Sequence, residues 1–459
     1  MTEVKRYEGS VADRLERLPF SSFHRNFLFM LAAGEWAESL MLLGNGALLS
    51  LVASYYGLSG ALATYALPAP FFAGEFVGSW LFGYLADRRG RRSVFLYNQL
   101  IFGLGMLIAG FMPIWQLIAL FVFIGGIGVG GEFPLVDSYG SEIFKGKQRG
   151  TRLALVYTLA VTAAPFIVYI TSLTAHVGPL THGIGYYSFR IPLWIMGIAG
   201  IAVWALRLRL TESPRWLETH GRYEEADRIT RAIEERVMRE KKLSQLPPVT
   251  EKTDPYQKPT RFRDLFAKDI RSRTIMMLIF QIFQGGLFYG FTTFAPSLLV
   301  KKYPLHDPLG YAAVIYAGFF VGSVANVFII DKVERKWGIV ITAVLAGVVG
   351  SLFAVANGLL AEVILGFLTA FILWNFSNFF HQYQAEIFPT RVRTTAAGFV
   401  YAWSRISTSL LIILIGTFFL PHGPLAVFEF AWVLIAIIVA DLAILGPRST
   451  GKRLEEIAK

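Results

Sequence analysis

The stretch GYLADRRGRR, residues 83–92, is a short basic segment between two long apolar runs. It combines one aspartate with four arginines, whereas the runs on either side, near 60–84 and 94–112, are almost free of charge. Each run is long enough to cross the apolar core of a bilayer, which takes about 20 residues. A basic loop between two such runs is typical of the cytoplasmic face of a membrane protein.

The same signals recur later in the chain at a fixed spacing. Four charged positions each have a counterpart of like charge 244 residues further on: Asp87 and Asp331, Arg91 and Arg335, Glu142 and Glu386, and Arg149 and Arg393. Two separate motifs that share one offset indicate a duplicated unit whose halves run in parallel. We therefore expect two pseudo-symmetric halves, each with its own copy of the charged loop.

Apolar runs of spanning length account for most of the chain. Apolar residues make up 54% of the 459 residues and charged residues 16%, and the mean hydropathy is +0.50, which is typical of lipid contact. The runs lie near 25–52, 60–84, 94–112, 115–140, 151–174 and 190–209, and then near 274–300, 310–330, 338–356, 360–384, 394–419 and 427–445. The predicted fold is an all-α membrane protein with twelve transmembrane helices in two pseudo-symmetric six-helix bundles.

The connections between the runs alternate in charge. Every second connection is basic or mixed, whereas the others contain almost no Lys or Arg, with Lys301 and Lys302 as the exception. This bias places both termini and the central linker in the cytoplasm, and the protein in the cytoplasmic membrane. The predicted order is a cytoplasmic N-terminal amphipathic segment (1–24), a first bundle (25–210), a cytoplasmic linker with short helices (211–273), a second bundle (274–446) and a cytoplasmic tail (447–459).

Several classes of function are excluded or disfavoured by the composition. The chain has no cysteine, which excludes disulfides and thiolate metal sites. No Ser-His-Asp cluster, metal-ligand spacing or nucleotide loop lies outside the predicted spans, so we expect neither an enzyme nor a cofactor, a metal ion or ATP. The basic loops account for the net charge of +11 without nucleic acid. The polar N-terminal segment lacks the apolar core of a cleavable signal peptide.

The loop motifs resemble those of the major facilitator superfamily. GYLADRRGRR (83–92) is similar to its G-x-L-x-D-R-x-G-R-R signature, and ESPRWLETHGRYEEA (212–226) resembles the P-E-S-P-R-W-L element of its sugar porter branch. EIFPTRVRTTAAG (386–398) and WSRIS (403–407) are closer to metabolite–proton symporters, organic ion transporters and synaptic-vesicle-protein-like transporters. The resemblance spans the whole chain, and it implies a gradient-driven transporter whose central cavity opens alternately to each side.

Two features of the sugar porter branch are absent. Val122 stands where that branch has an arginine in its fourth helix, and only Gln284 remains of its Q-Q-x-x-G-I-N pattern in the seventh. These departures disfavour the sugar recognition typical of the branch.

Carboxylates inside the predicted spans are candidates for proton coupling. A charge at membrane depth is costly and is usually functional, and a buried carboxyl group can exchange a proton near neutral pH. The predicted coupling residues are Glu38, where related symporters have an aspartate, Glu132, at the acidic position of phosphate symporters, and Glu35, one turn before Glu38. A structural hydrogen-bonding role is the alternative for each. Glu75 and Asp137 are assigned to packing or gating, with Asp137 about one turn from the cytoplasmic end of its helix.

Arg405 is the clearest clue to the substrate. In organic anion transporters and metabolite symporters an arginine at this position is associated with anionic substrates, and a guanidinium can hold a carboxylate through two hydrogen bonds. The alternative is that Arg405 reaches the cytoplasmic surface or pairs with Glu386. The other predicted substrate-binding residues are polar or aromatic: Gln284, Tyr289, Trp374, Asn378 and His381, with Asn375 and Tyr383 as further candidates for the same cavity.

The loop motif and its repeat are predicted to form a cytoplasmic gate that latches the two halves in an outward-facing state. The predicted gate residues are Gly83, Asp87, Arg88, Gly90, Arg91, Glu142, Arg149, Asp331, Arg335, Glu386 and Arg393. Breaking the latch should shift the conformational equilibrium and leave the substrate site intact.

Together these features predict secondary active transport. The expected activity is proton-coupled symport of a small polar metabolite by alternating access, with an organic acid or other anion favoured over a sugar. Uncoupled sugar facilitation, proton-driven drug export and a non-transporting membrane sensor are the alternatives. The expected partners are the substrate, protons and the lipid bilayer, with no nucleic acid, and the protein is expected to be a monomer.

Overall fold

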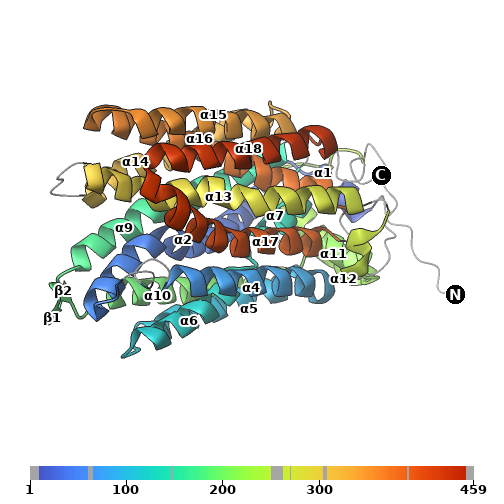
Figure 1. Cartoon of the computed structure of the whole chain (residues 1–459). Coiled ribbons are helices and arrows are strands. Elements are labelled where there is room, and N and C mark those ends of the chain that lie inside the picture. The colour runs from blue at the N-terminus through green and yellow to red at the C-terminus, as the bar shows by residue number, and fades with distance from the viewer. Residues whose placement is uncertain are drawn as a thin grey trace.

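Long helices that run side by side make up almost all of the molecule (Figure 1). The computed structural model describes residues 10–450 apart from 60–61, 63–65, 146–147, 250–261, 269, 303–307 and 390–391. The first half contains α2 (Ser22–Tyr56), α4 (Pro68–Arg89), α5 (Arg91–Ala109), α6 (Trp115–Val129), α7 (Glu132–Ile143), α8 (Arg149–Ala160), α9 (Ala163–Thr174) and α10 (Arg190–Arg207). The second half contains α13 (Arg271–Lys302), α14 (Pro308–Ile329), α15 (Arg335–Val355), α16 (Leu359–Ile387), α17 (Arg393–Leu414) and α18 (Pro424–Leu445).

These helices form twelve membrane-spanning segments within the described residues, which confirms the predicted fold. α6 and α7 together make one span, as do α8 and α9. By length and composition, ten segments are apolar enough to cross a membrane, and α4 and α14 are the other two. The predicted start of the second span was wrong: α4 begins at Pro68 rather than near residue 60, because a proline suits the first turn of a helix, where no backbone N–H is needed.

Glycines on α6 and at its C-terminal cap bring it unusually close to α4. A Cβ atom added at Gly126 would lie 2.4 Å from the carbonyl oxygen of Phe71, and one added at Gly130 would lie 2.3 Å from that of Glu75. Only a residue without a side chain allows such backbone contact between helices. The contact fixes the position of the α4 backbone at Glu75, whose side chain lies beside Arg405 of the second half.

The two ends of the bundle carry different connections (Figure 1). At one end lie α1 (Val11–Glu16), α11 (Pro214–Thr219) and α12 (Tyr223–Lys241), and the 3₁₀ helix η2 (Phe262–Phe266) precedes α13. At the opposite end is a hairpin of β1 (Leu180–Thr181) and β2 (Ile184–Gly185), whose turn residues His182 and Gly183 both have positive φ, as a type I′ turn requires. A π-helix, η3 (Ile415–Phe419), and a 3₁₀ helix, η4 (Leu420–His422), join α17 to α18.

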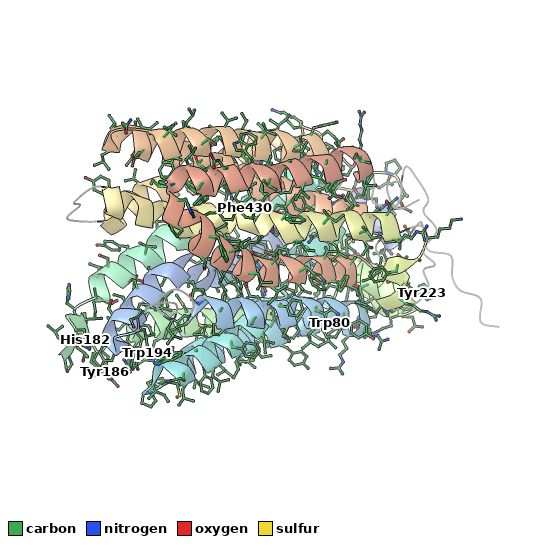
Figure 2. All side chains as sticks on the ribbon, in the orientation of Figure 1. Trp80, His182, Tyr186, Trp194, Tyr223 and Phe430 are labelled. Atoms are coloured by element: carbon green, nitrogen blue, oxygen red, sulfur yellow. The ribbon has the colours of Figure 1, made fainter. Side chains whose placement is uncertain are left out.

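Large apolar side chains cover the outside of the spans. Trp80 on α4 and Trp403 on α17 are among many that are more than one-third exposed, and Trp80 projects from the side of the bundle in Figure 2. Exposed apolar surface on this scale suits contact with lipid tails. Charged side chains are instead buried between the bundles or placed at the helix ends, so the interior is where the functional groups must be sought.

Candidate functional site

A small cavity lies between the two bundles. Its lining comes from α2, α7 and α8 of the first half and α13, α16 and α17 of the second: Leu42, Leu43, Phe133, Tyr157, Gln284, Phe288, Tyr289, Trp374, Ser377, Asn378, Phe380, His381 and Tyr401. Five of the six predicted substrate-binding residues are in this set. The volume of about 20 Å³ is suited to a water molecule rather than a metabolite. Side chains around the cavity must therefore move before a substrate can enter.

Arg405, the sixth predicted substrate residue, lies directly behind this lining. Its guanidinium donates a hydrogen bond of 2.6 Å to the hydroxyl of Tyr289 and a second to the hydroxyl of Tyr401. Only 1% of the residue is exposed, so the alternative that Arg405 reaches the cytoplasmic surface is wrong. Pairing with Glu386 is also contradicted, because Glu386 instead faces Arg335, with 2.9 Å between Oε2 and Nε.

Three buried glutamates surround Arg405 or lie close to it. Glu75 Oε2 is 3.2 Å from Arg405 Nε, and Glu38 Oε1 is 3.9 Å from Arg405 Nη2. Glu35, one turn before Glu38, is fully buried, and neither of its carboxylate oxygens has a hydrogen-bond partner among the described residues. Glu75 was expected to serve packing or gating, but it lies closer to the arginine than Glu38 does.

Glu132, the third predicted coupling residue, has a different environment. Its carboxylate forms a two-pronged salt bridge with Arg207, whose Nη1 lies 2.9 Å from Oε2 and whose Nη2 bonds Oε1. Asn98 and Gln99 donate further hydrogen bonds of 2.8 and 3.1 Å to Oε2. A fully buried carboxylate with this many donors is a structural ion pair, which argues against the predicted coupling role.

Asp137 is also placed differently from the prediction. It lies six residues before the end of α7 and is fully buried, not at a solvated helix end. Its carboxylate bonds Tyr157 on α8 and lies 3.0 Å from Nδ1 of His381 on α16. His381 thus bridges the two halves as well as lining the cavity.

Two further cavity candidates do not line the cavity. Asn375 binds the side chain of Asn326 at 3.0 Å, which ties α16 to α14 within the second half. The hydroxyl of Tyr383 donates a 2.9 Å hydrogen bond to the carbonyl oxygen of Pro447, just after α18. Both are structural hydrogen bonds within the second half.

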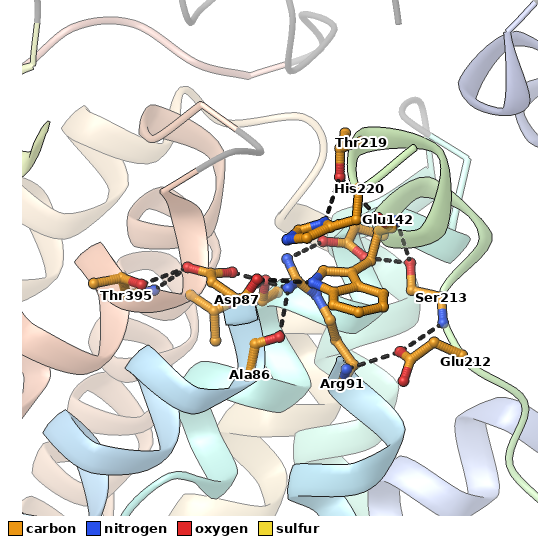
Figure 3. Close-up of polar contacts among 12 residues, drawn as sticks. Ala86, Asp87, Arg91, Glu142, Glu212, Ser213, Thr219, His220 and Thr395 are labelled. Atoms are coloured by element: carbon orange, nitrogen blue, oxygen red, sulfur yellow. Dashed lines mark hydrogen bonds and ion pairs between the residues drawn. The ribbon is translucent and has the colours of Figure 1, made fainter. Parts of the chain in front are cut away.

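Three of the predicted gate residues, Asp87, Arg91 and Glu142, meet at the end of the bundle that carries the linker helices (Figure 3). Asp87 at the end of α4 accepts hydrogen bonds from the backbone N–H and the hydroxyl of Thr395 on α17, at 2.7 and 2.6 Å. Arg91 links Asp87 to Glu142, each at 2.9 Å, and Ser213 of the linker donates to Glu142 at 2.5 Å. A carboxylate from one half therefore caps the start of a helix in the other half, where the helix dipole is positive.

The repeated motif makes the same contact in the opposite direction. Asp331 accepts hydrogen bonds from the backbone N–H and the hydroxyl of Thr151 on α8, at 2.8 and 2.6 Å. Arg335 lies 3.0 Å from Asp331 and 2.9 Å from Glu386. Since Thr151 and Thr395 also differ by 244 positions, the two latches are related by the internal repeat.

The arginines after the two Glu-Ile-Phe motifs have different contacts. Arg149 spans the interface, with its guanidinium 3.9 Å from Glu386 of the other half and 3.7 Å from Glu16 of α1. Arg393 donates a hydrogen bond of 3.2 Å to the carbonyl oxygen of Phe388.

The glycines of the loop motif have separate steric roles. A Cβ atom at Gly83 would lie 2.8 Å from the carbonyl oxygen of Thr394 and 3.1 Å from Cα of Gly398, both on α17. Gly90 has a φ of +99°, and a Cβ atom there would collide with Glu212, which accepts a hydrogen bond from the N–H of Arg91. Arg88 is exposed and stacks on the ring of Tyr84, at 4.5 Å from its centre, so it lies beside the latch rather than in it.

Sequence reasoning missed the partners of the buried charges. Arg207 was hidden at the basic end of a predicted span, where an arginine usually reaches the membrane surface. Tyr401 and Phe133 are aromatic residues among many, and no sequence signal distinguished them. The pair of Asp137 and His381 could have been found, because these residues are separated by the same 244 positions as the gate motifs.

The comparisons with known proteins agree with this architecture. Residues 46–459 match the family described as sugar (and other) transporter. The chain is 27% identical to the putative metabolite transport protein YyaJ of Bacillus subtilis, with 97% of each chain covered. It is 24% identical to the niacin transporter NiaP of Acinetobacter baylyi, covering 97% of this chain and 99% of NiaP.

Among solved structures, the proton:xylose symporter XylE bound to 6-bromo-6-deoxy-D-glucose matches with a TM-score of 0.75 at 18% identity, over 95% of this chain and 98% of XylE. This likeness shows the shared fold. The relatives and structural neighbours are transporters, in agreement with the expectation that the chain is not an enzyme. The chain belongs to the sugar (and other) transporter family of the major facilitator superfamily.

Proposed function

We propose that the protein is a proton-coupled symporter of a small organic acid. The observation that supports this most directly is the cluster of Glu35, Glu38 and Glu75 around Arg405, buried beside the central cavity. Three carboxylates bring three negative charges against one guanidinium. An uncompensated charge is costly in such an interior, so the cluster is neutral only when two of the carboxylates are protonated.

The contact between Arg405 and Glu75 provides a physical link between protons and an anion. While Glu75 is ionised, it occupies the guanidinium at 3.2 Å. Protonation of Glu75, with Glu38 beside it, weakens this attraction and frees Arg405 to bind the carboxylate of a substrate. The proton and the anion then bind together and are released together, which is the requirement for symport.

The lining of the cavity favours an aromatic acid. Phe133, Tyr157, Phe288, Trp374 and Tyr401 present ring surfaces, whereas Gln284 and Asn378 supply the few amide groups. A sugar would need many more hydrogen-bonding groups around it. One relative, from Acinetobacter baylyi, is named as a transporter of niacin, a pyridine carboxylate, and another, from Bacillus subtilis, is named as a putative niacin/nicotinamide transporter. We therefore propose a heteroaromatic or aromatic monocarboxylate as the substrate class.

The proposed setting is a monomer in the cytoplasmic membrane, with both termini in the cytoplasm. The end of the bundle with α1, α11 and α12 would be the cytoplasmic end, since it carries the basic loop of Arg88 to Arg92.

The experiment is uptake into proteoliposomes with and without an inward proton gradient. The panel is nicotinate, benzoate, succinate, phosphate and xylose, tested on wild type, Glu38→Gln, Glu75→Gln and Arg405→Ala, with the exposed Glu429→Gln on α18 as the matched control. We expect gradient-driven uptake of nicotinate or benzoate that is lost in Arg405→Ala and unchanged in Glu429→Gln. In Glu38→Gln and Glu75→Gln, exchange of substrate should persist while accumulation against a gradient is lost.

Other outcomes identify the alternatives. Xylose uptake that survives Arg405→Ala would overturn the organic acid assignment and indicate a sugar transporter, as the matching family and XylE would suggest. Uptake that ignores both the proton gradient and Glu38→Gln would contradict proton coupling and leave a facilitator.

A further inference from the structure

A second group of buried titratable residues joins the two bundles away from Arg405. Asp137 on α7 bonds the hydroxyl of Tyr157 on α8, and its other carboxylate oxygen lies 3.0 Å from Nδ1 of His381 on α16. All three residues are at most 2% exposed. The acid belongs to the first half and the base to the second, so this bond must break or stretch whenever the halves separate at this level.

Asp137 and His381 occupy equivalent positions of the internal repeat, because they are separated by 244 residues, as the gate motifs are. Residues related in this way face each other across the pseudo-symmetry axis between the halves. The imidazole of His381 is stacked between Phe133 and Phe380, with ring centres 4.6 and 4.3 Å away, and also lines the cavity. The pair is thus fixed in place by aromatic rings and adjoins the proposed substrate route.

Charged and aromatic groups surround this pair, and the net charge of the pair among them depends on its proton. Glu35 on α2 interacts electrostatically with Asp137 and Tyr157, Tyr401 on α17 has its ring centre 5.4 Å from that of His381, and Tyr289 on α13 lines the same cavity. Arg405, which lies 5.9 Å from the ring of Phe133, is engaged by Glu75 and the two tyrosines. With one proton between them, Asp137 and His381 carry no net charge, and without it a negative charge is left in a dry interior.

We propose that Asp137, His381 and Tyr157 form a second proton-binding site, which holds a proton while the cytoplasmic side is closed and releases it when that side opens. On opening, the carboxylate and the imidazole separate and become hydrated, so the pair can no longer hold the proton between them. By linkage, opening must become more favourable as the pH rises. The site adds to the proposed coupling at Glu38 and can be tested apart from it.

The test measures the cytoplasmic opening directly. Because the chain has no cysteine, spin labels can be placed on two introduced cysteines, at the exposed residues Arg89 of the first half and Lys332 of the second, with the protein in nanodiscs. Double electron–electron resonance then gives the ratio of open to closed molecules from pH 5 to pH 8. We expect this ratio to rise with pH, by up to about tenfold per pH unit for each proton released.

Variants separate this site from other causes of pH dependence. His381→Gln and Asp137→Asn should each reduce the pH dependence of the open-to-closed ratio by the equivalent of one released proton. Size-exclusion profiles establish that the variants are folded. Ser138→Ala is the matched control, since it breaks an adjacent bond between the halves, 2.5 Å to Thr394, that carries no titratable group. It should change the ratio equally at every pH and leave the slope unchanged.

Comparison with Glu38→Gln decides between the two proton sites. The slope is the change with pH in the ratio of open to closed molecules. We expect Glu38→Gln to retain the part of this slope that is lost in His381→Gln. A slope that is intact in His381→Gln and Asp137→Asn but absent in Glu38→Gln would overturn the second site and leave the proposed function standing. The proposed function is tested separately by the uptake experiment. It predicts that Glu38→Gln loses gradient-driven uptake while the part of the pH dependence that requires His381 is retained.

Discussion

Two buried glutamates of the first bundle differ in what surrounds them. Glu132 shares both carboxylate oxygens with Arg207 and receives amide hydrogen bonds from Asn98 and Gln99. Glu38 lies 3.9 Å from Arg405, and among the described residues its carboxyl group has only the carboxyl group of Glu75 as a hydrogen-bonding neighbour. The first environment fixes a charge pair, and the second leaves room for a proton to be gained and lost. Burial alone therefore does not identify a coupling residue.

Glu132→Gln is expected to destabilise the protein rather than uncouple it. Removing one partner of a buried ion pair leaves the other charge uncompensated, at a cost of about 3–5 kcal/mol. Thermal unfolding in detergent should show a marked loss of stability for Glu132→Gln and little change for Glu38→Gln. The double variant Glu132→Gln/Arg207→Met should recover most of the loss, because no unpaired charge remains. A fully stable Glu132→Gln would contradict the structural assignment.

At the scale of single elements, α4 and α17 cross at a contact that depends on glycine. A Cβ atom at Gly398 would lie 2.4 Å from the carbonyl oxygen of Ser79 and 3.0 Å from Cα of Gly83, and backbone atoms cannot give way as side chains can. Gly398→Ala should therefore force the halves apart at the end of the bundle that carries the linker helices. The control is Gly46→Ala on α2, where an added Cβ meets nothing within 4 Å.

The readout for this crossing is the reactivity of a cysteine placed at the interface, in the otherwise cysteine-free chain. Thr395→Cys lies at the latch and should react slowly with a maleimide in the Gly46→Ala background and faster with Gly398→Ala. Equal rates in the two backgrounds would show that α4 and α17 tolerate the extra methyl group without opening.

The N-terminal helix α1 is attached to the linker helix α12 by charge. Burial alone would raise the pKa of Glu234, but hydrogen bonds from Arg14 and Arg17 outweigh burial and hold the pKa below its ordinary value. A lowered carboxyl pKa stabilises the docked state at pH values above the ordinary glutamate pKa of about 4.3, and the effect is lost as the pH falls through the lowered value.

Docking of α1 should therefore be stable at neutral pH and weaken at acid pH. Hydrogen exchange at residues 11–16 should be slow at pH 7 and faster, after correction for intrinsic rates, below about pH 4. Glu234→Gln should give fast exchange already at pH 7, while Glu235→Gln, at the neighbouring exposed position, should not. Protection that is independent of both pH and Glu234 would exclude the charge pair as the cause of docking.

For the whole molecule, the fold could be predicted well from the sequence because the main signals are independent of one another. Twelve apolar runs, alternating loop charge and one repeated offset each indicate the same architecture, so an error in one run, such as the start of α4, does not change the result. The site was harder to predict. Whether Glu75 or Glu132 faces Arg405 depends on helix rotation and on which basic side chain lies opposite, and no pattern within a single helix contains that information.

The orientation in the membrane is open to a direct test. Leu180 lies in the hairpin at one end of the bundle and Tyr223 at the start of α12 at the other, and both are exposed. In intact cells, a membrane-impermeant maleimide should label Leu180→Cys, and it should label Tyr223→Cys only after the cells are permeabilised. The reverse pattern would place the linker outside and contradict the proposed cytoplasmic termini.

The internal repeat leads to a prediction about the closed state of the whole molecule. Asp87 caps α17 through Thr395, and Asp331 caps α8 through Thr151, so each half is latched by the other with the same chemistry. Loss of a helix cap costs about 0.5–2 kcal/mol, so Asp87→Ala and Asp331→Ala should each raise the ratio of open to closed molecules by about 2- to 30-fold. The two latches stabilise the same closed state at separate places. The double variant should therefore raise the ratio of open to closed molecules by the product of the two single effects. The spin-label distance between positions 89 and 332 measures all three variants, with Ser50→Ala, an exposed hydroxyl on α2, as the control. An effect of one aspartate without the other would mean that the two halves do not share the latch equally, and that the repeat is symmetric in sequence but not in mechanism.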